Sequence, residues 1–296
     1  HVLGRMVQGA RAMTTADGLN AERKALPLSL TPNMSTVVRG THRIALVGSR
    51  GRMGAMLCER WSEAGHTVAG IDLPLTDDAF ASALDGADAA VLCIPAGALP
   101  ETLHRLVPHM DGRQVLMDIT SVKIRPLEQM EAAYTGPVVG THPLFGPQPN
   151  ATDLRVCITP GSRAGETEIA LVESLFHDMG CTVFRSTAEE HDRASAAIQG
   201  LNFITNVAYF ATLAHREELL PYLTPSFRRR LDAARKMLTE DAALFEWLFE
   251  ANPLSTEAVR RYRSFLNVAA GGDVNILVRQ AAWWWERETP ADKKLI

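Results

Sequence analysis

The chain has 296 residues, of which 46% are hydrophobic and 22% charged. This is typical of one large or two ordinary globular domains and excludes disordered, collagen-like and coiled-coil proteins. Thirty Lys and Arg against 34 Asp and Glu give a net charge of −4, which disfavours nucleic-acid binding. No apolar run approaches the roughly 18 residues of a membrane span, so we expect a soluble, cytoplasmic protein without a membrane or nucleic-acid partner.

The first forty residues show no sustained period of 2 or 3.6. The chain starts at His1, and Arg5 and Arg11 precede the first acidic residue, Asp17, a pattern faintly similar to a transit peptide. We favour an upstream extension, with Met34 as the natural start. Residues 1–40 are therefore predicted to lie outside the core and to be weakly ordered or weakly packed.

Strand-like and helix-like segments alternate from residue 41 to 187. The helix-like segments include Met53, Leu57 and Trp61, which share one helix face, and further helices are predicted at 99–106, 125–133 and 166–179. Seven short apolar runs are predicted to be strands, at 43–47, 67–71, 89–94, 114–117, 137–140, 155–159 and 182–185. This order predicts an α/β domain with a doubly wound, Rossmann-type parallel sheet over 41–187.

The pattern becomes helical after residue 187. Thr187 and Glu190 have the spacing of a capping box, and the sequence from there to about residue 216 is typical of one long helix. Further amphipathic segments lie at 226–236, 242–250, 256–268 and 273–287. We predict an all-helical domain over 188–296, and because so small a unit buries little surface alone, we expect it to form a homodimer.

A glycine-rich loop joins the first predicted strand to the first predicted helix. Gly51 and Gly54 match the last two glycines of a GxGxxG fingerprint, with Ser49 in the first position and Gly48 just before it. Glycines allow a tight turn and a close approach of backbone amides to a pyrophosphate, and the helix N-terminus adds positive charge. The loop therefore predicts a dinucleotide site.

The second strand ends at Asp72, about 20 residues further on, where a carboxylate accepts hydrogen bonds from the ribose hydroxyls of NAD and repels the 2′-phosphate of NADP. Arg50 and Arg52 either reach the phosphates or face solvent. We predict NAD as the cofactor, bound by Gly48, Ser49, Arg50, Gly51, Arg52, Met53, Gly54, Asp72 and Pro95.

Polar residues follow three later strands, and ligands of open α/β sheets bind beyond the carboxyl ends of strands. His142 is the best acid–base candidate, because its pKa lies near neutrality and suits taking a proton as a hydride leaves the same carbon. A hydroxyl of Ser121 or Thr120 would orient the ring. The alternative is a turn histidine held by Pro143. Lys123 either binds a carboxylate or is an exposed lysine at a helix start.

These motifs together resemble the prephenate/arogenate dehydrogenase family of tyrosine biosynthesis. The resemblance covers about residues 43–290 and rests on the glycine loop and on three further motifs: Asp118-Ile-Thr-Ser121-Val-Lys123, Gly140-Thr-His142-Pro-Leu-Phe-Gly146-Pro and Glu190-His191-Asp192. It implies NAD-dependent oxidative decarboxylation of prephenate to 4-hydroxyphenylpyruvate. His142 would accept the substrate hydroxyl proton, Ser121 would hydrogen bond to this pair, and Lys123 would be a nearby functional lysine. The helical half would dimerise and close the substrate cleft.

The substrate half departs from the family pattern at several positions. Phe203 stands one helical turn beyond Gln199, where the family usually has a histidine, and Lys236, next to Arg235, stands where an arginine grips a carboxylate. The expected tyrosine is Phe245. Lysine binds a carboxylate as a point charge and cannot form the bidentate hydrogen bonds of arginine. We expect Gln199, Phe203, Arg235 and Lys236 to bind the substrate.

Several alternatives to prephenate stay open. The substrate could be arogenate or 4-amino-4-deoxyprephenate, or the chain could be a non-catalytic NAD-binding homologue. Another Rossmann dehydrogenase, such as a β-hydroxyacid enzyme, fits the motif around His142 less well.

The remaining conspicuous residues have structural interpretations. His191, beside the capping box, is interpreted as structural, and Trp283-Trp-Trp285 as a core or dimer contact. No spacing of His, Cys, Asp and Glu indicates a metal site. Four cysteines without CxxC spacing are predicted to be buried, reduced thiols: Cys58, Cys93, Cys157 and Cys181.

Overall fold

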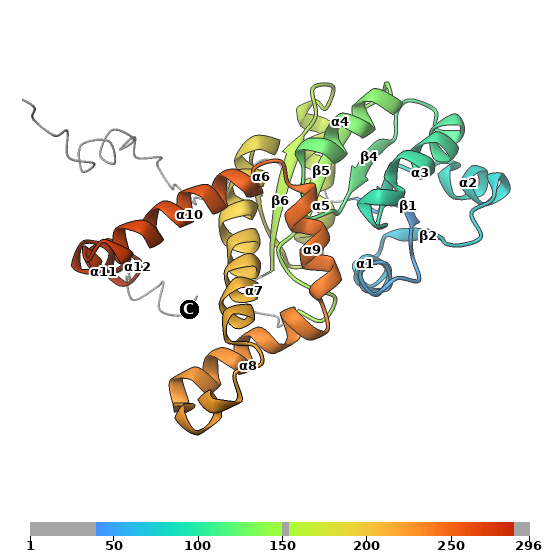
Figure 1. Cartoon of the computed structure of the whole chain (residues 1–296). Coiled ribbons are helices and arrows are strands. Elements are labelled where there is room, and N and C mark those ends of the chain that lie inside the picture. Colours follow the sequence, from blue (N-terminus) through green and yellow to red (C-terminus); the bar gives the residue numbers. More distant parts are fainter. Residues whose placement is uncertain (1–39, 150–153, 287–296) are drawn as a thin grey trace, which may run out of the picture. The chain divides into compact units, whose positions relative to one another are not determined.

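The computed structural model describes residues 40–149 and 154–286 (Figure 1). Residues 1–39 of the predicted extension, with Met34, lie outside the described residues. The predicted alternation in the α/β half is confirmed, and the structure adds a short helix, α2, that the sequence did not predict. The elements are β1 (Arg43–Val47), α1 (Arg52–Glu63), β2 (Thr67–Ile71), α2 (Asp77–Leu84), β3 (Ala89–Leu92), α3 (Leu99–Leu106), β4 (Val115–Asp118), α4 (Ile124–Ala133), β5 (Val138–Pro143), β6 (Arg155–Pro160), α5 (Glu166–Asp178) and β7 (Thr182–Arg185).

The seven strands form one sheet in the order β2-β1-β3-β4-β5-β6-β7. Five of the six pairs are parallel, as predicted, whereas β5 and β6 are antiparallel. The segment that joins these two strands, residues 144–154, is too short for the crossover that a parallel pair needs. Because β1 to β5 run in one direction, their carboxyl ends meet at one edge of the sheet.

Apolar residues cover both faces of this sheet. Alternating residues of β1 point to opposite faces, Ile44 into one cluster and Ala45 into the other. Helices α1 and α5 cover the first face with Trp61 and Phe176, and the Trp61 indole N–H donates to the Leu175 carbonyl over 2.8 Å. Helices α2, α3 and α4 cover the second face. The prediction of a doubly wound sheet is confirmed.

After β7 every element of the described chain is helical, as predicted. The capping box of Thr187 and Glu190 is present, but the predicted long helix is interrupted by a π-helical turn, Ala196–Gly200. The predicted segment 273–287 forms two helices, and Arg287 lies outside the described residues. The elements are α6 (Ala188–Ser195), α7 (Leu201–Leu213), a 3₁₀ segment (Glu217–Tyr222), α8 (Pro225–Thr239), α9 (Ala242–Ala251), α10 (Ser255–Ala270), α11 (Val274–Ala281) and α12 (Trp283–Glu286).

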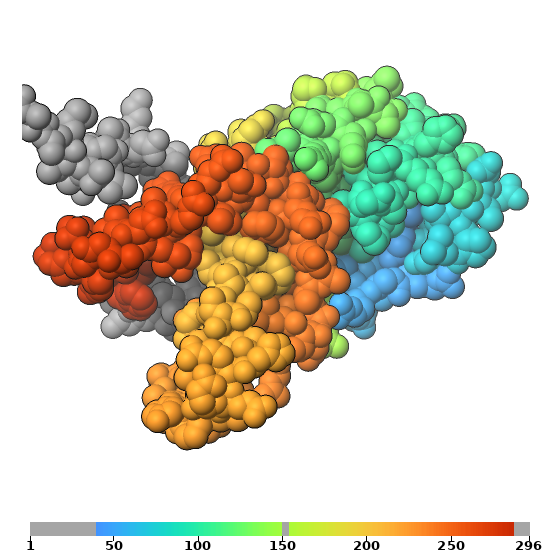
Figure 2. Space-filling view, viewed as in Figure 1, coloured from blue at the N-terminus to red at the C-terminus, as the bar shows by residue number. Residues whose placement is uncertain are grey.

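These later helices bury few apolar side chains. Among the described residues from α7 onward, the buried hydrophobic side chains are Phe203, Ala234 and Leu248. In the view of Figure 2 the C-terminal helices, in orange and red, lie at the surface, and α11 and α12 bury none of their described side chains. No helix in the described ranges combines the length and apolar character needed to cross a bilayer. The four cysteines are free, with Cys157 and Cys181 buried and the other two half-buried.

Candidate active site

The glycine loop has the tight geometry of a nucleotide-binding turn. Gly48 has φ +85°, and a Cβ there would collide with the Cys93 carbonyl oxygen. A Cβ at Gly54 would collide with the Gly48 carbonyl oxygen, so the loop tolerates no side chain at either position. Helix α1 begins after Gly51 with no side-chain cap and no acidic residue in its first turn. Its first amides are therefore suited to an anion.

Asp72 lies beside this loop at the end of β2. Its carboxylate accepts hydrogen bonds from the backbone amides of Arg50 over 2.7 Å and Leu73 over 2.8 Å, and these bonds hold its pKa below the usual value. The Arg50 guanidinium lies 3.6 Å from the same carboxylate and donates to the Leu73 carbonyl. The structure thus places Arg50 against Asp72, with most of its side chain exposed.

The other predicted cofactor residues surround the same edge of the sheet. The Ser49 hydroxyl donates to the Ile71 carbonyl oxygen over 3.3 Å, which ties the loop to β2. Met53 is half-buried against the core. Pro95 is exposed and precedes a 3₁₀ turn after β3. These positions fit a nucleotide cradle formed by the ends of β1, β2 and β3.

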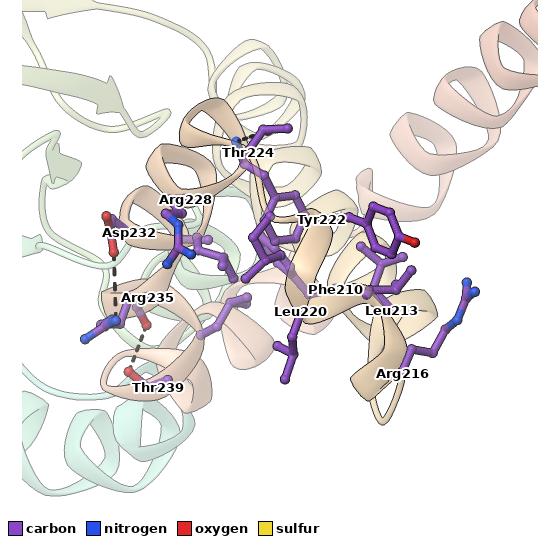
Figure 3. A pocket seen from close by; sticks show the side chains of 16 residues that line it. Phe210, Leu213, Arg216, Leu220, Tyr222, Thr224, Arg228, Asp232, Arg235 and Thr239 are labelled. Atoms are coloured by element: carbon purple, nitrogen blue, oxygen red, sulfur yellow. Dashed lines mark hydrogen bonds and ion pairs between the residues drawn. The ribbon is translucent and has the colours of Figure 1, made fainter.

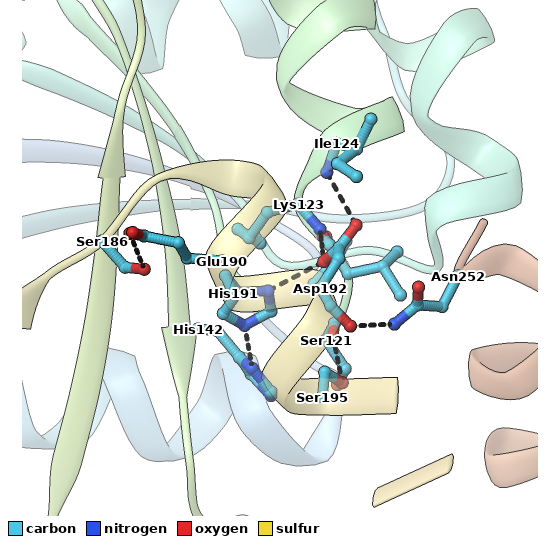
Figure 4. A network of polar contacts seen from close by, with 12 residues as sticks. Ser121, Lys123, Ile124, His142, Ser186, Glu190, His191, Asp192, Ser195 and Asn252 are labelled. Atoms are coloured by element: carbon cyan, nitrogen blue, oxygen red, sulfur yellow. Dashed lines mark hydrogen bonds and ion pairs between the residues drawn. The ribbon is translucent and has the colours of Figure 1, made fainter. Parts of the chain in front are cut away.

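His142 lies on β5, three strands from β1 in the sheet, and is only 3% exposed. Its Nδ1 is 2.8 Å from Nε2 of His191, and Nδ1 of His191 is 2.8 Å from an Asp192 carboxylate oxygen (Figure 4). Of the two predicted hydroxyl partners, Thr120 is wrong, because its hydroxyl bonds to the Asp118 carboxylate and the Val122 carbonyl instead. The Ser121 hydroxyl stays a prediction. The partner of His142 is a second histidine.

Asp192 anchors this pair of rings. Its buried carboxylate accepts the backbone amides of Lys123 over 2.7 Å and Ile124 over 3.0 Å, at the start of α4. Its carbonyl oxygen accepts the side-chain amide of Asn252, which lies between α9 and α10, over 2.8 Å. The α/β half and the later helices therefore both hold Asp192.

Lys123 is fully buried and has its own carboxylate partner. Its Nζ is 2.6 Å from Asp118 and 2.7 Å from the carbonyl oxygen of Thr141, the residue before His142. Burial lowers the pKa of the ammonium, and Asp118 opposes that change. Lys123 is thus neither the exposed lysine of one alternative nor a group free to grip a substrate carboxylate. It joins β4 to β5 beneath His142.

The electrostatic surroundings keep His142 neutral near pH 7. Burial lowers its pKa well below 6.5, and the nearby His191 and Lys123 lower the pKa further. Among the described residues, none hydrogen bonds to Nε2 of His142. A neutral imidazole with one uncommitted ring nitrogen can accept a proton.

Ser121 and Gln199 lie beside this network. The Ser195 hydroxyl is 2.7 Å from Oε1 of Gln199 and 3.4 Å from the Ser121 carbonyl oxygen. Gln199 belongs to the π-helical turn, a feature that is frequent at functional sites. The structure therefore brings these two predicted residues together through Ser195.

Lys236 lines an open groove of about 640 Å³ between α7, α8 and α9. Its Nζ is 3.7 Å from Asp241, and the same carboxylate is 3.9 Å from the guanidinium of Arg52 in the glycine loop. Phe245, also in the lining, stacks on the buried Phe203 with ring centroids 5.8 Å apart. Lys236 thus lines this groove, and Arg52 and Phe203 contact two of its lining residues, Asp241 and Phe245.

The comparisons with known proteins agree with this geometry. Residues 53–185 match the family model of the prephenate dehydrogenase nucleotide-binding domain. This stretch of the chain is therefore similar to the nucleotide-binding domain of prephenate dehydrogenases. It is 28% identical over 223 residues to the T-protein of Enterobacter agglomerans, across 74% of this chain and 59% of the T-protein. The chain therefore spans about three fifths of that relative's length.

Two crystal structures share the fold. That of arogenate dehydrogenase from Synechocystis has a TM-score of 0.69 at 20% identity and covers 86% of this chain and 99% of its own. That of prephenate dehydrogenase from A. aeolicus, in complex with hydroxyphenyl propionate and NAD+, has a TM-score of 0.68 at 18% identity and covers 84% and 96%. Both likenesses show that the shared fold extends well beyond residues 53–185.

Arg235 lies apart from the groove that Lys236 lines. It lines a different groove, of about 800 Å³, between α7, the 3₁₀ segment and α8, where its guanidinium is 3.8 Å from Asp232 (Figure 3). Leucines and aromatic rings dominate the lining of this groove, and none of the described residues in it comes from the glycine loop or from β5. The structure thus separates Arg235 from Lys236.

The sequence did not assign two of the groups found here. The sequence pattern around His191 favours a structural role, although the residue belongs to the motif with Asp192 that carries the family resemblance. Asp241 has no motif around it, and only the fold places it between Lys236 and Arg52. Within the described ranges, no three His, Cys, Asp or Glu side chains converge as a metal site requires.

Proposed function

We propose that this chain catalyses the NAD-dependent oxidative decarboxylation of prephenate to 4-hydroxyphenylpyruvate. The observation that carries the proposal is His142, a buried neutral imidazole whose Nε2 is uncommitted at the same sheet edge as the glycine loop and Asp72. A base at this edge suits removal of a hydroxyl proton as a hydride departs. The match to the prephenate dehydrogenase nucleotide-binding domain supports the same activity.

The residues of the loop fit NAD. Gly48 and Gly54 leave room for a pyrophosphate, the start of α1 offers amides, and Asp72 is placed to accept ribose hydroxyls. When bound, NAD would supply the hydride acceptor. The A. aeolicus relative was crystallised with NAD+, which supports this choice.

His142 would take the proton of the substrate 4-hydroxyl through Nε2 while the hydride leaves the same ring carbon. The bond from the ring to its carboxylate then breaks, carbon dioxide leaves, and the bonding electrons make the ring aromatic. His142 returns its proton to the phenolate oxygen, so one NADH and one carbon dioxide form with no net proton released. Because aromatisation drives the reaction, the protein chiefly orients the substrate and stabilises charge. Ser121, Gln199, Phe203 and Lys236 would line the substrate site.

Arogenate is a second candidate substrate, favoured by one observation. Asp241 lies 3.7 Å from Lys236 in the groove, and this pair suits the ammonium and carboxylate of an amino-acid side chain better than a dianion. Asp241→Asn should then raise the KM for arogenate and not for prephenate, as measured by NADH absorbance. A larger effect on prephenate would contradict this role.

The activity test compares NADH formation from prephenate and from arogenate at equal enzyme concentration, with His142→Asn as the matched control. Turnover of at least one substrate is expected, and the variant should lose about 10²- to 10⁴-fold in kcat with unchanged affinity for NAD. Tight NAD binding without turnover of either substrate would contradict the proposal and favour a non-catalytic homologue.

We further infer that residues 41–187 act as the dinucleotide domain and 188–296 as a domain that forms a homodimer. Helices α11 and α12 bury none of their described side chains, and Ile276, Val278 and Trp284 are about half exposed or more. Exposed apolar surface of this kind marks an interaction site. A second copy would cover it.

A further inference from the structure

We propose that His191 and Asp192 are positioning residues that fix the tautomer of His142, so that Nε2 of His142 is the nitrogen that accepts the proton. This inference rests on the proposed function, in which His142 is the base. The three side chains form one line of hydrogen bonds, 2.8 Å from ring to ring and 2.8 Å from ring to carboxylate (Figure 4). His142 comes from β5, and the other two residues come from α6.

The direction of these bonds is set at the Asp192 end. The backbone amides of Lys123 and Ile124 can only donate, so the Asp192 carboxylate accepts both, and it accepts a third hydrogen bond from Nδ1–H of His191. A neutral His191 that is protonated on Nδ1 has a lone pair on Nε2. That lone pair accepts Nδ1–H of His142, which leaves Nε2 of His142 without a hydrogen.

Burial and the nearby charge of Lys123 favour the neutral form of His142. His142 is 3% exposed, His191 5% and Asp192 0%, and the Lys123 ammonium lies beneath them. A second buried positive charge beside this ammonium would be costly before substrate binds. With His142 neutral, the line of hydrogen bonds from Asp192 through His191 gives its ring a single orientation.

The same line of bonds stabilises His142 after it takes the proton. The imidazolium keeps its Nδ1–H bonded to His191, and His191 is bonded in turn to a buried carboxylate. A carboxylate that holds a catalytic histidine in one tautomer also stabilises the imidazolium that forms, as in the serine proteases. Here a second imidazole extends the reach of the carboxylate from α6 to β5.

The substitutions that test this role exploit the two ends of the His191 ring. His191→Gln places an amide near the Nε2 position, where its oxygen can accept from His142. His191→Asn reaches only the Nδ1 position, beside Asp192. His191→Gln should therefore retain about a tenth of the wild-type kcat, whereas His191→Asn should lose about 10²- to 10³-fold, each with little change in KM. Glu189→Gln, exposed on the same helix, is the control and should change kcat less than about 2-fold.

NMR spectroscopy reports the tautomer of His142 independently of enzyme activity. Long-range ¹H–¹⁵N spectra of the full chain labelled with ¹⁵N-histidine, with the His142 signals assigned from His142→Asn, should show His142 protonated on Nδ1 in the wild type and in His191→Gln. His191→Asn should shift the ring toward Nε2 protonation.

The possible outcomes separate this inference from the proposed function. Turnover with His142 protonated on Nε2 in the wild type would overturn the tautomer assignment and leave the activity intact. Nδ1 protonation without turnover of prephenate or arogenate would support the assignment and contradict the function. Equal loss in His191→Gln and His191→Asn, with both folded by thermal unfolding, would overturn the positioning role.

Discussion

The α/β half and the C-terminal helices differ in how they bury apolar surface. Ile44, Leu46 and Trp61 of the α/β half are fully buried, and helices cover both faces of its sheet. Among the described residues of α10 to α12, the one buried side chain is Ser255. Helices in proteins gain most of their stability from packing an apolar face. The sheet half therefore folds around its own core, whereas the last helices leave apolar side chains such as Ile276 and Val278 exposed, as the proposed dimer surface requires.

The largest expected effect comes from truncating the sheet core. Trp61→Ala should lower the free energy of unfolding by about 3–5 kcal/mol, because it removes a buried ring and leaves a cavity. The truncation Val278→Ala removes an exposed apolar side chain of α11. It should lower the free energy of unfolding by less than about 0.5 kcal/mol at protein concentrations at which the chain is monomeric. Urea denaturation measures both free energies of unfolding. Equal losses of stability in the two variants would contradict the difference between the two halves.

A polar version of the same comparison uses two ion pairs. Lys123→Met leaves the buried Asp118 without its 2.6 Å partner and should cost about 3–5 kcal/mol, because an unpaired charge stays buried. Arg235→Ala breaks an exposed pair with Asp232 at 3.8 Å and should cost less than about 1 kcal/mol. Chemical denaturation measures both losses of stability. A small loss in Lys123→Met would show that the buried pair of Lys123 and Asp118 contributes little to the free energy of unfolding.

Charging the exposed apolar surface tests the need for a partner. Ile276→Asp should weaken dimer formation by about 2–3 kcal/mol, because association would bury a carboxylate, and it should leave the unfolding of the sheet half unchanged. Sedimentation velocity over a range of concentrations measures the dissociation constant. A dimer that tolerates the aspartate, or a wild-type chain that stays monomeric, would contradict the proposed dimer surface.

The smallest expected effect is a dependence on pH confined to the α/β half. Burial lowers the pKa of both His66 and His142, so below about pH 6.5 the unfolded chain binds protons that the folded chain does not. Stability should therefore fall as pH drops from 6.5 toward the folded pKa values. Urea midpoints between pH 7.5 and 5.5 should shift less in His142→Asn than in wild type. An equal shift of the urea midpoint in both proteins would show that His142 does not contribute to the pH dependence of stability.

The sequence predicted those features that local patterns encode. The seven strands lie within a few residues of the predicted runs, and Thr187 and Glu190 form their capping box because both partners lie in one helical turn. Helix α2 was missed, although Thr76 caps it and two aspartates begin it, because eight residues give only about two turns of periodicity. The antiparallel pairing of β5 and β6 could not be predicted, because an apolar run of residues indicates a buried strand but not the direction in which that strand runs.

The site was harder to predict, since its key bonds join residues far apart in the chain. His142 could be selected from its position after a strand, but its bond to His191 spans 49 residues. Lys123 carries no sign of burial, because only the fold brings Asp118 and Thr141 around its ammonium. Arg235 and Lys236 are neighbours in sequence, yet a helix turns them toward different grooves.

The stoichiometry of the reaction tests the central claim most directly. Purified chain, NAD and prephenate should yield one NADH and one carbon dioxide for each prephenate consumed, with the product absorbing as a phenol, and His142→Asn should slow all three signals together. NADH formation without carbon dioxide, or consumption of prephenate without NADH, would contradict oxidative decarboxylation by this chain.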